Sequence, residues 1–240
     1  MRKQSIILDI KIAVDLAMTV LFILLTGYHL LGNIQHEWIG VCVFVLFLVH
    51  NALNWRWYRS LFKGKYTLIR TLQTIVNILL WVVMFCNIIS SFMLSRYIFG
   101  FLGITNRSVG RRLHMISTIW TFILISVHIG LHWQMFIGLA NRLIKPNPAV
   151  RKLLVLISRI IVLALFCYGV IAFIQRQLWN EMFLLTEFKF TDPDESFIRF
   201  ITDYTAIMEV FVCVGYYLKM ILIKGEKRCK KKYRVSADKE

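Results

Sequence analysis

The sequence predicts an all-α membrane protein, a polytopic bundle of about six transmembrane helices. Of its 240 residues, 58% are hydrophobic and only 18% are charged. A chain of this composition cannot bury its apolar surface in one water-soluble core. The apolar residues form six runs, each near the ~20 residues that a helix needs to cross the hydrocarbon core. These runs cover approximately Ala13–Leu31, Trp38–Trp57, Leu72–Leu94, Leu113–Leu139, Leu153–Ile174 and Tyr204–Ile223.

The distribution of lysine and arginine predicts how these helices are oriented. The N-terminus, the loops after the second and fourth runs, the inner end of the fifth run and the tail together carry 22 of the 29 basic residues. The positive-inside rule therefore places both termini in the cytoplasm of a multi-pass protein of the cytoplasmic membrane. The net charge of +16 comes from short clusters between apolar runs, so we expect membrane lipid and no nucleic acid as a partner.

The N-terminal run and the cysteines add two narrower expectations. No small-residue cleavage site follows the first apolar run, so we expect a retained span rather than a signal peptide. The five cysteines include no C-x-x-C pair, so neither covalent haem attachment nor a zinc knuckle is expected.

Four histidines form two pairs with the same spacing, and they are the candidate functional residues. His36 and His50 are 14 residues apart on the second run, and so are His114 and His128 on the fourth. Fourteen residues bring a helix back to nearly the same face, ~21 Å further along. Both runs are predicted to cross from outside to inside, so the pairs match in depth. This geometry suits two stacked b-type haems between spans two and four, His36 and His114 holding the outer iron and His50 and His128 the inner one.

Other roles remain open for these and two further histidines. His36 and His114 lie at span ends, where an imidazole can simply cap a helix. His132 lies one turn beyond His128 and competes with it as the inner ligand, and His29 competes with His36 outside. For both we favour a supporting role, such as a hydrogen bond to a propionate or a quinone. Asn54 and Glu37 are candidates to accept a hydrogen bond from a ligand imidazole.

Three neighbours of the histidines fit a haem site. Gly40 follows His36 by one turn, where the missing side chain would let a flat macrocycle approach, although ordinary helix–helix contact also explains a glycine. Arg111 and Arg112 precede His114 and are candidates to pair with haem propionates.

These motifs resemble a known family. The stretches His36-Glu37-Trp38-Ile39-Gly40, His50-Asn51-Ala52-Leu53-Asn54-Trp55, His114-Met115-Ile116-Ser117 and His128-Ile129-Gly130-Leu131-His132-Trp133 are similar to the flavinylation-associated cytochromes, which are small bacterial membrane proteins. More distantly, the chain resembles ferric-reductase-like and respiratory cytochrome b proteins. The resemblance covers spans one to four. It implies a bacterial inner-membrane cytochrome with two haem b groups, which exchanges electrons with an extracytosolic flavoprotein, with a quinone as a further candidate partner.

The sequence thus predicts an electron-carrier subunit rather than a stand-alone enzyme. We expect a di-haem membrane domain over residues 1–140, two further spans with an acidic outer loop over 141–223, and a basic cytoplasmic tail over 224–240. The tail holds no glycine-rich nucleotide loop, so a redox partner is needed at each face. A histidine-lined metal-ion transporter that also uses Asp15 and Glu209 is the alternative, followed by a non-redox membrane assembly factor.

Overall fold

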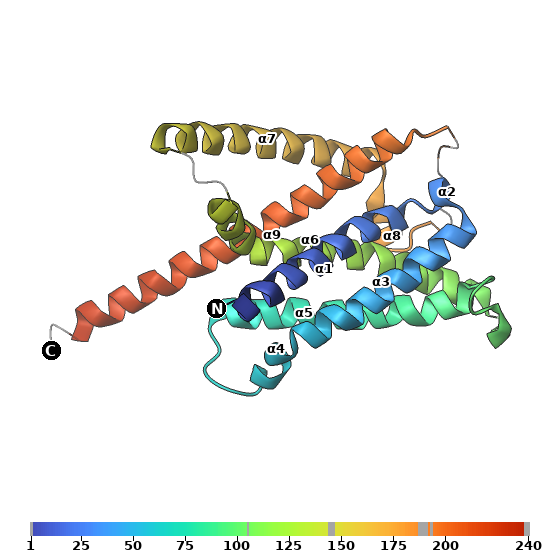
Figure 1. The fold of residues 1–240 in the computed structure, drawn as a ribbon, viewed down its shortest axis with the longest axis horizontal. Coiled ribbons are helices and arrows are strands. Elements are labelled where there is room, and N and C mark those ends of the chain that lie inside the picture. The colour runs from blue at the N-terminus through green and yellow to red at the C-terminus, as the bar shows by residue number, and fades with distance from the viewer. Residues whose placement is uncertain (1, 105, 144–146, 187–191, 193, 238–240) are drawn as a thin grey trace. The chain divides into compact units, whose positions relative to one another are not determined.

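The computed structural model describes residues 2–104, 106–143, 147–186, 192 and 194–237, and every regular element in this part of the chain is helical (Figure 1). Its order is α1 (Arg2–Thr26), α2 (Tyr28–Leu31), α3 (Asn33–Leu53), α4 (Trp55–Ser60), α5 (Leu68–Leu94), the 3-10 turn η1 (Gly100–Leu102), α6 (Arg107–Leu143), α7 (Pro148–Gln175), α8 (Leu178–Met182) and α9 (Phe197–Ala237).

The last four predicted runs each lie on one long helix, and the first two are each divided between a long helix and a short one. Five of the described helices, α3, α5, α6, α7 and α9, are long and apolar enough to cross a membrane. These helices indicate a multi-pass membrane protein, which confirms the predicted all-helical class. The first run differs: α1 is not among the five, because it carries Asp9, Lys11 and Asp15 close together. The tail, which we expected to follow the last span, continues α9 as a helix to Ala237.

Two of the predicted apolar runs are each divided into two helices, one run at a glycine and the other at an asparagine. The first predicted run is divided at Gly27, where a Cβ atom would lie 2.8 Å from the ring of Phe200. Gly32 follows at φ +78°, a conformation that side-chain-bearing residues rarely adopt, and it starts α3. The second run ends its first helix at Asn54, the residue that separates α3 from α4.

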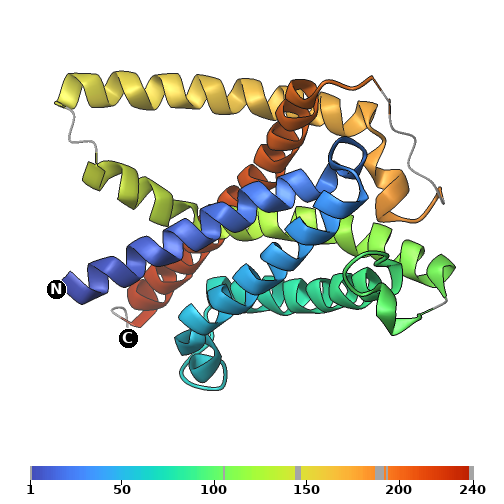
Figure 2. The same ribbon diagram turned by 45° about the vertical axis from the view of Figure 1, so that its right-hand side comes forward.

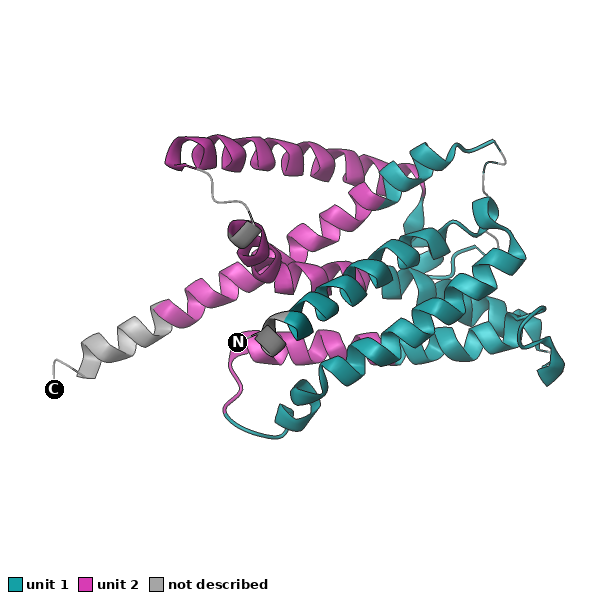
Figure 3. Ribbon diagram, viewed as in Figure 1, with its two compact units in different colours: residues 1–64, 82–122, 177–204 teal, residues 65–81, 123–176, 205–240 magenta. Residues whose placement is uncertain are grey.

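The described residues pack as two compact units (Figure 3). Unit 1 contains residues 1–64, 82–122 and 177–204, and unit 2 contains residues 65–81, 123–176 and 205–240. These are groups of packed residues rather than consecutive segments, so the division expected at residues 140 and 223 stays a prediction.

Unit 1 holds α1 to α4 together with parts of α5, α6 and α9, and α1 packs against α3. Its core includes Phe122 and Tyr204, whose rings meet edge to face with centroids 5.7 Å apart. Leu178 and Phe200 are also fully buried there. The indole Nε1–H of Trp120 donates to the carbonyl of Met182 at 3.1 Å and so connects α6 with α8.

Unit 2 brings α6, α7 and α9 together through glycines. A Cβ atom at Gly130 would lie 2.1 Å from the carbonyl oxygen of Val212, and one at Gly215 would lie 2.3 Å from that of Val127. Gly169 of α7 approaches Ala206 of α9 as closely. Small residues let membrane helices approach at backbone distance. Near this contact α7 lies beside α9, and the two helices diverge toward the start of α7 (Figure 2).

Candidate haem site

His36 of α3 and His114 of α6 lie together in unit 1. Their ring centroids are 6.2 Å apart and their planes make an angle of 74°. A histidine nitrogen bonds a metal at about 2 Å and its ring centre lies about 1 Å behind, so two imidazoles on opposite sides of one ion place their centroids about 6 Å apart. Two residues 78 positions apart in the sequence therefore meet at the separation that one metal ion requires.

His36 also has an unsatisfied polar atom. Its Nδ1 is buried and finds no hydrogen-bond partner among the described residues. Its ring is packed edge to face against Tyr28, with centroids 5.1 Å apart. A buried imidazole nitrogen without a partner costs about 1–3 kcal/mol, so this position is unfavourable for a histidine with a purely structural role.

His114 has a defined proton arrangement. Its Nδ1 lies 3.1 Å from Oγ of Ser90, and that hydroxyl donates its own proton to the carbonyl of Asn87 at 2.9 Å. Since the serine proton is committed to Asn87, the serine oxygen accepts from the imidazole Nδ1–H. Neutral His114 therefore carries its lone pair on Nε2, the nitrogen that is left to bind a metal.

The side chain of Asn87 fixes α6 against α5 beside this histidine. Its Oδ1 accepts from Ser117 at 2.9 Å and from Thr118 at 3.0 Å, and its Nδ2 donates to Thr121 at 2.7 Å. Such polar contacts hold membrane helices in a defined rotation. Because Ser117 lies one turn from His114, the cluster sets the face on which His114 projects.

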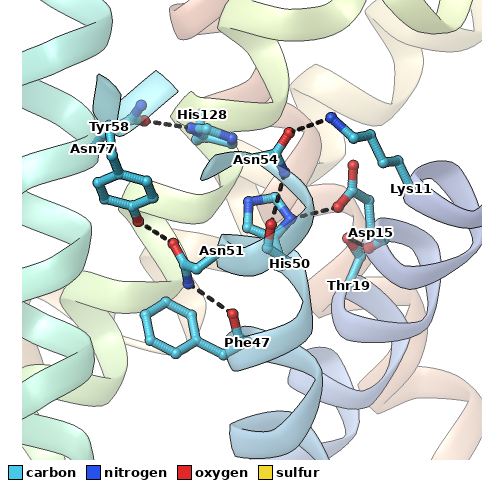
Figure 4. A network of polar contacts seen from close by, with 10 residues as sticks. All are labelled: Lys11, Asp15, Thr19, Phe47, His50, Asn51, Asn54, Tyr58, Asn77 and His128. Atoms are coloured by element: carbon cyan, nitrogen blue, oxygen red, sulfur yellow. Dashed lines mark hydrogen bonds and ion pairs between the residues drawn. The ribbon is translucent and has the colours of Figure 1, made fainter. Parts of the chain in front are cut away.

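His50 has a carboxylate partner. Its Nδ1 lies 2.6 Å from Oδ1 of Asp15 on α1, within unit 1 (Figure 4). A carboxylate accepts, so neutral His50 also donates from Nδ1 and keeps its lone pair on Nε2. A carboxylate behind an imidazole raises its basicity toward a metal. Roughly a quarter of each of the two side chains is exposed, 26% for His50 and 28% for Asp15.

Lys11 and Asn54 complete this contact between α1 and α3. The ammonium of Lys11 donates to Oδ1 of Asn54 at 2.9 Å, and Nδ2 of Asn54 donates to the backbone carbonyl of His50 at the same distance. Figure 4 shows Lys11 and Asp15 reaching from α1 toward α3. Asn54 thus contacts the backbone of His50, not its ring, which differs from the role we expected.

In unit 2, His128 is paired with Asn77 of α5. Its Nδ1 lies 2.9 Å from Oδ1 of Asn77, so the ring again donates from Nδ1. The ring of His132 lies one turn away, with centroids 4.8 Å apart and an interplanar angle of 40°. His50 belongs to unit 1 and His128 to unit 2.

Glu37, next to His36, binds a turn of the backbone instead of an imidazole. Its carboxylate accepts from Oγ of Ser95 at 2.7 Å, from the N–H of Arg96 at 2.8 Å and from the N–H of Ile98 at 2.9 Å. The N–H of Tyr97 adds a longer bond of 3.2 Å. Glu37 therefore anchors the beginning of α3 to the end of α5.

The remaining predicted residues have separate positions. His29 uses Nε2 to contact Oε2 of Glu195 at 2.9 Å, while its ring packs on Phe200. A Cβ atom at Gly40 would meet nothing within 4 Å among the described residues, so helix–helix contact does not explain this glycine. Arg111 and Arg112 are exposed in the first turns of α6.

Sequence reasoning missed Ser90 and Asn77, which contact the rings of His114 and His128, and considered Asp15 only for the transporter alternative and not as the partner of His50. The available signal was the small polar residues inside apolar runs, such as Asn87 with Ser90 and Ser117 with Thr121. In the part of the chain that the structure describes, no group of three or more His, Cys, Asp or Glu side chains is placed to hold a metal ion. A haem iron needs only two from the protein. No family model, curated protein or solved structure matches the chain.

Proposed function

We propose that the chain is a membrane b-type cytochrome that transfers electrons across the bilayer. The observation that carries the proposal is the 6.2 Å separation of the His36 and His114 rings, together with the partnerless Nδ1 of His36. Haem b, when bound, supplies one-electron redox chemistry, while the protein supplies ligands, hydrogen bonds and burial. The residues around this pair fit such a group.

At the outer position, each residue near His36 and His114 would contribute to binding the haem. His114 holds its proton on Nδ1 against Ser90 and offers Nε2, and His36 approaches from the facing helix. The open space at Gly40 leaves room for a flat group beside α3, and the guanidinium groups of Arg111 and Arg112 are candidates for the propionates. His29 already uses Nε2 on Glu195, so we assign the outer ligand to His36.

The second haem rests on sequence spacing and on the partners of its two candidate ligands. His50 and His128 repeat the 14-residue interval, and each donates from Nδ1 to a neighbouring helix, to Asp15 and to Asn77. His132 is then a supporting residue beside His128. We propose that the protein lies in a bacterial cytoplasmic membrane with both termini inside. It would exchange electrons with an extracytosolic flavoprotein or another redox partner, and quinone is a further candidate for an electron-exchange partner.

The test is the absorption spectrum of the full chain, purified in mild detergent from cells that are supplied with haem. We expect a Soret band, a reduced-minus-oxidised α-band of b type, and two haems per chain. His114→Ala and His36→Ala should each lose about half of the haem, because each removes one of two iron ligands at one site. His29→Ala is the matched control and should retain both. A folded, colourless preparation refutes the proposal.

A further inference from the structure

The beginning of α7 carries an open groove with three cationic side chains. The groove has a volume of about 540 Å³ and is lined by Pro148, Arg151, Lys152, Val155, Leu156 and Arg159. All of these residues are exposed. Lys152 and Arg159 are seven residues apart, which puts them on one face of the helix and about 10 Å apart along its axis. Val155 and Leu156 form the apolar surface between them.

Arg159 has an unusual environment for a charged residue. It lies inside an apolar run, after Leu153–Ile157 and before Ile160–Phe166, on a helix long enough to cross a membrane. It makes no hydrogen bond or ion pair with the described residues. A cation placed about 9 Å inside the start of an apolar run is costly unless it reaches the interface or an anion. Helical side chains lean toward the helix N-terminus, which from Arg159 is the direction of Lys152.

We infer that this groove binds an anionic phospholipid. Its phosphate would lie between Lys152 and Arg159, with Arg151 beside it, and an acyl chain would cover Val155 and Leu156. Charge complementarity selects the ligand: three cations surround a small apolar surface, and no described acidic residue lines the groove. The positive-inside rule, which puts this end of α7 in the cytoplasm, places the groove in the leaflet where anionic headgroups attract basic residues.

The inference is independent of haem binding and is tested by native mass spectrometry of the full chain in neutral detergent. Phosphatidylglycerol is titrated in, and we expect one lipid to remain bound at low molar excess. The double variant Lys152→Gln/Arg159→Gln should weaken this binding at least about tenfold, since it removes two of the three cations that attract the anionic headgroup. Lys224→Gln/Lys227→Gln removes the same two charges from exposed positions on α9 and should bind like the unmodified chain.

Two further measurements distinguish a bound phospholipid from free phosphate and from a second copy of the chain. Phosphatidylcholine should bind more weakly than phosphatidylglycerol, and inorganic phosphate at the concentration of the lipid should not displace it. The inference fails if the double variant binds as tightly as the unmodified chain, if phosphatidylcholine binds equally well, or if free phosphate competes. It also fails if the double variant instead dissociates a dimer, because the groove would then be a contact between two copies.

Discussion

Oδ1 of Asp15 lies 2.6 Å from Nδ1 of His50, so a carboxylate on the first helix orients an imidazole 35 residues later. Asp15 is one of the charges that set α1 apart from the five apolar helices. Under the proposed function this charge supports metal binding, because a carboxylate behind an imidazole both fixes the ring and strengthens its bond to a metal.

If His50 binds haem as proposed, replacing Asp15 with asparagine should weaken that binding. Loss of such a partner typically lowers metal affinity by about 10–100-fold. In Asp15→Asn we expect haem to dissociate more readily, and the midpoint potential of the remaining inner haem to rise because the less basic imidazole stabilises the ferric state less. Redox titration and haem quantification measure both effects. Asp9→Asn, at an exposed position on the same helix, should change neither.

Under the proposed function, replacing Ser90 with alanine should affect the outer haem. The change removes the oxygen that accepts the Nδ1–H of His114 and leaves a half-buried imidazole without that partner. We expect a loss of stability of about 1–3 kcal/mol and a raised midpoint potential for one of the two haems. Ser91→Ala is the matched control, because Ser91 is the next residue and is exposed. An unchanged potential in Ser90→Ala would mean that His114 is not a ligand.

Replacing Glu37 with alanine should loosen the beginning of α3. The carboxylate accepts from Ser95 and from consecutive backbone N–H groups, so its removal leaves these donors without an acceptor. We expect a destabilisation of about 1–3 kcal/mol, measured as thermal unfolding in detergent, and partial loss of one haem. Gln35→Ala, at an exposed position two residues earlier, should unfold at the same temperature as the unmodified chain.

Replacing Gly130 with alanine should disrupt the contact between α6 and α9. The added Cβ atom would lie 2.1 Å from the carbonyl oxygen of Val212, and backbone cannot move aside as a flexible side chain can. Overpacking of this kind costs about 1–3 kcal/mol. Gly138→Ala is a control on the same helix with nothing within 4 Å, and it should be neutral or slightly stabilising. Equal unfolding temperatures for the two variants would contradict the contact.

The helices could be predicted from the sequence because hydrophobicity is a local property. The helix Leu68–Leu94 begins four residues before the predicted run and ends with it, and Pro148–Gln175 begins five residues before its run and ends one residue after it. Caps rather than hydropathy decide where a helix begins. The break at Gly27 and the close approach of this glycine to the ring of Phe200, 173 residues away, were not predicted. Tertiary contacts of this kind are invisible to a hydrophobic pattern.

The candidate site was predictable in part for a related reason. The interval between His36 and His50 follows from helix geometry and is visible in the sequence. The hydrogen-bond partners are not, because they depend on which helices are neighbours. We expected Glu37 and Asn54 to serve the imidazoles, since they are close in sequence, but Glu37 binds backbone and Asn54 binds the carbonyl of His50.

The charged face of α1 has a consequence for how the chain enters the membrane. Lys11 and Asp15 have their partners, Asn54 and His50, at the end of α3, a helix that the ribosome completes only later. Until then α1 carries uncompensated charges that resist transfer into lipid. We therefore expect α1 to enter the bilayer together with α3 as a pair during synthesis, so that a nascent chain ending before residue 50 stays accessible to water-soluble reagents.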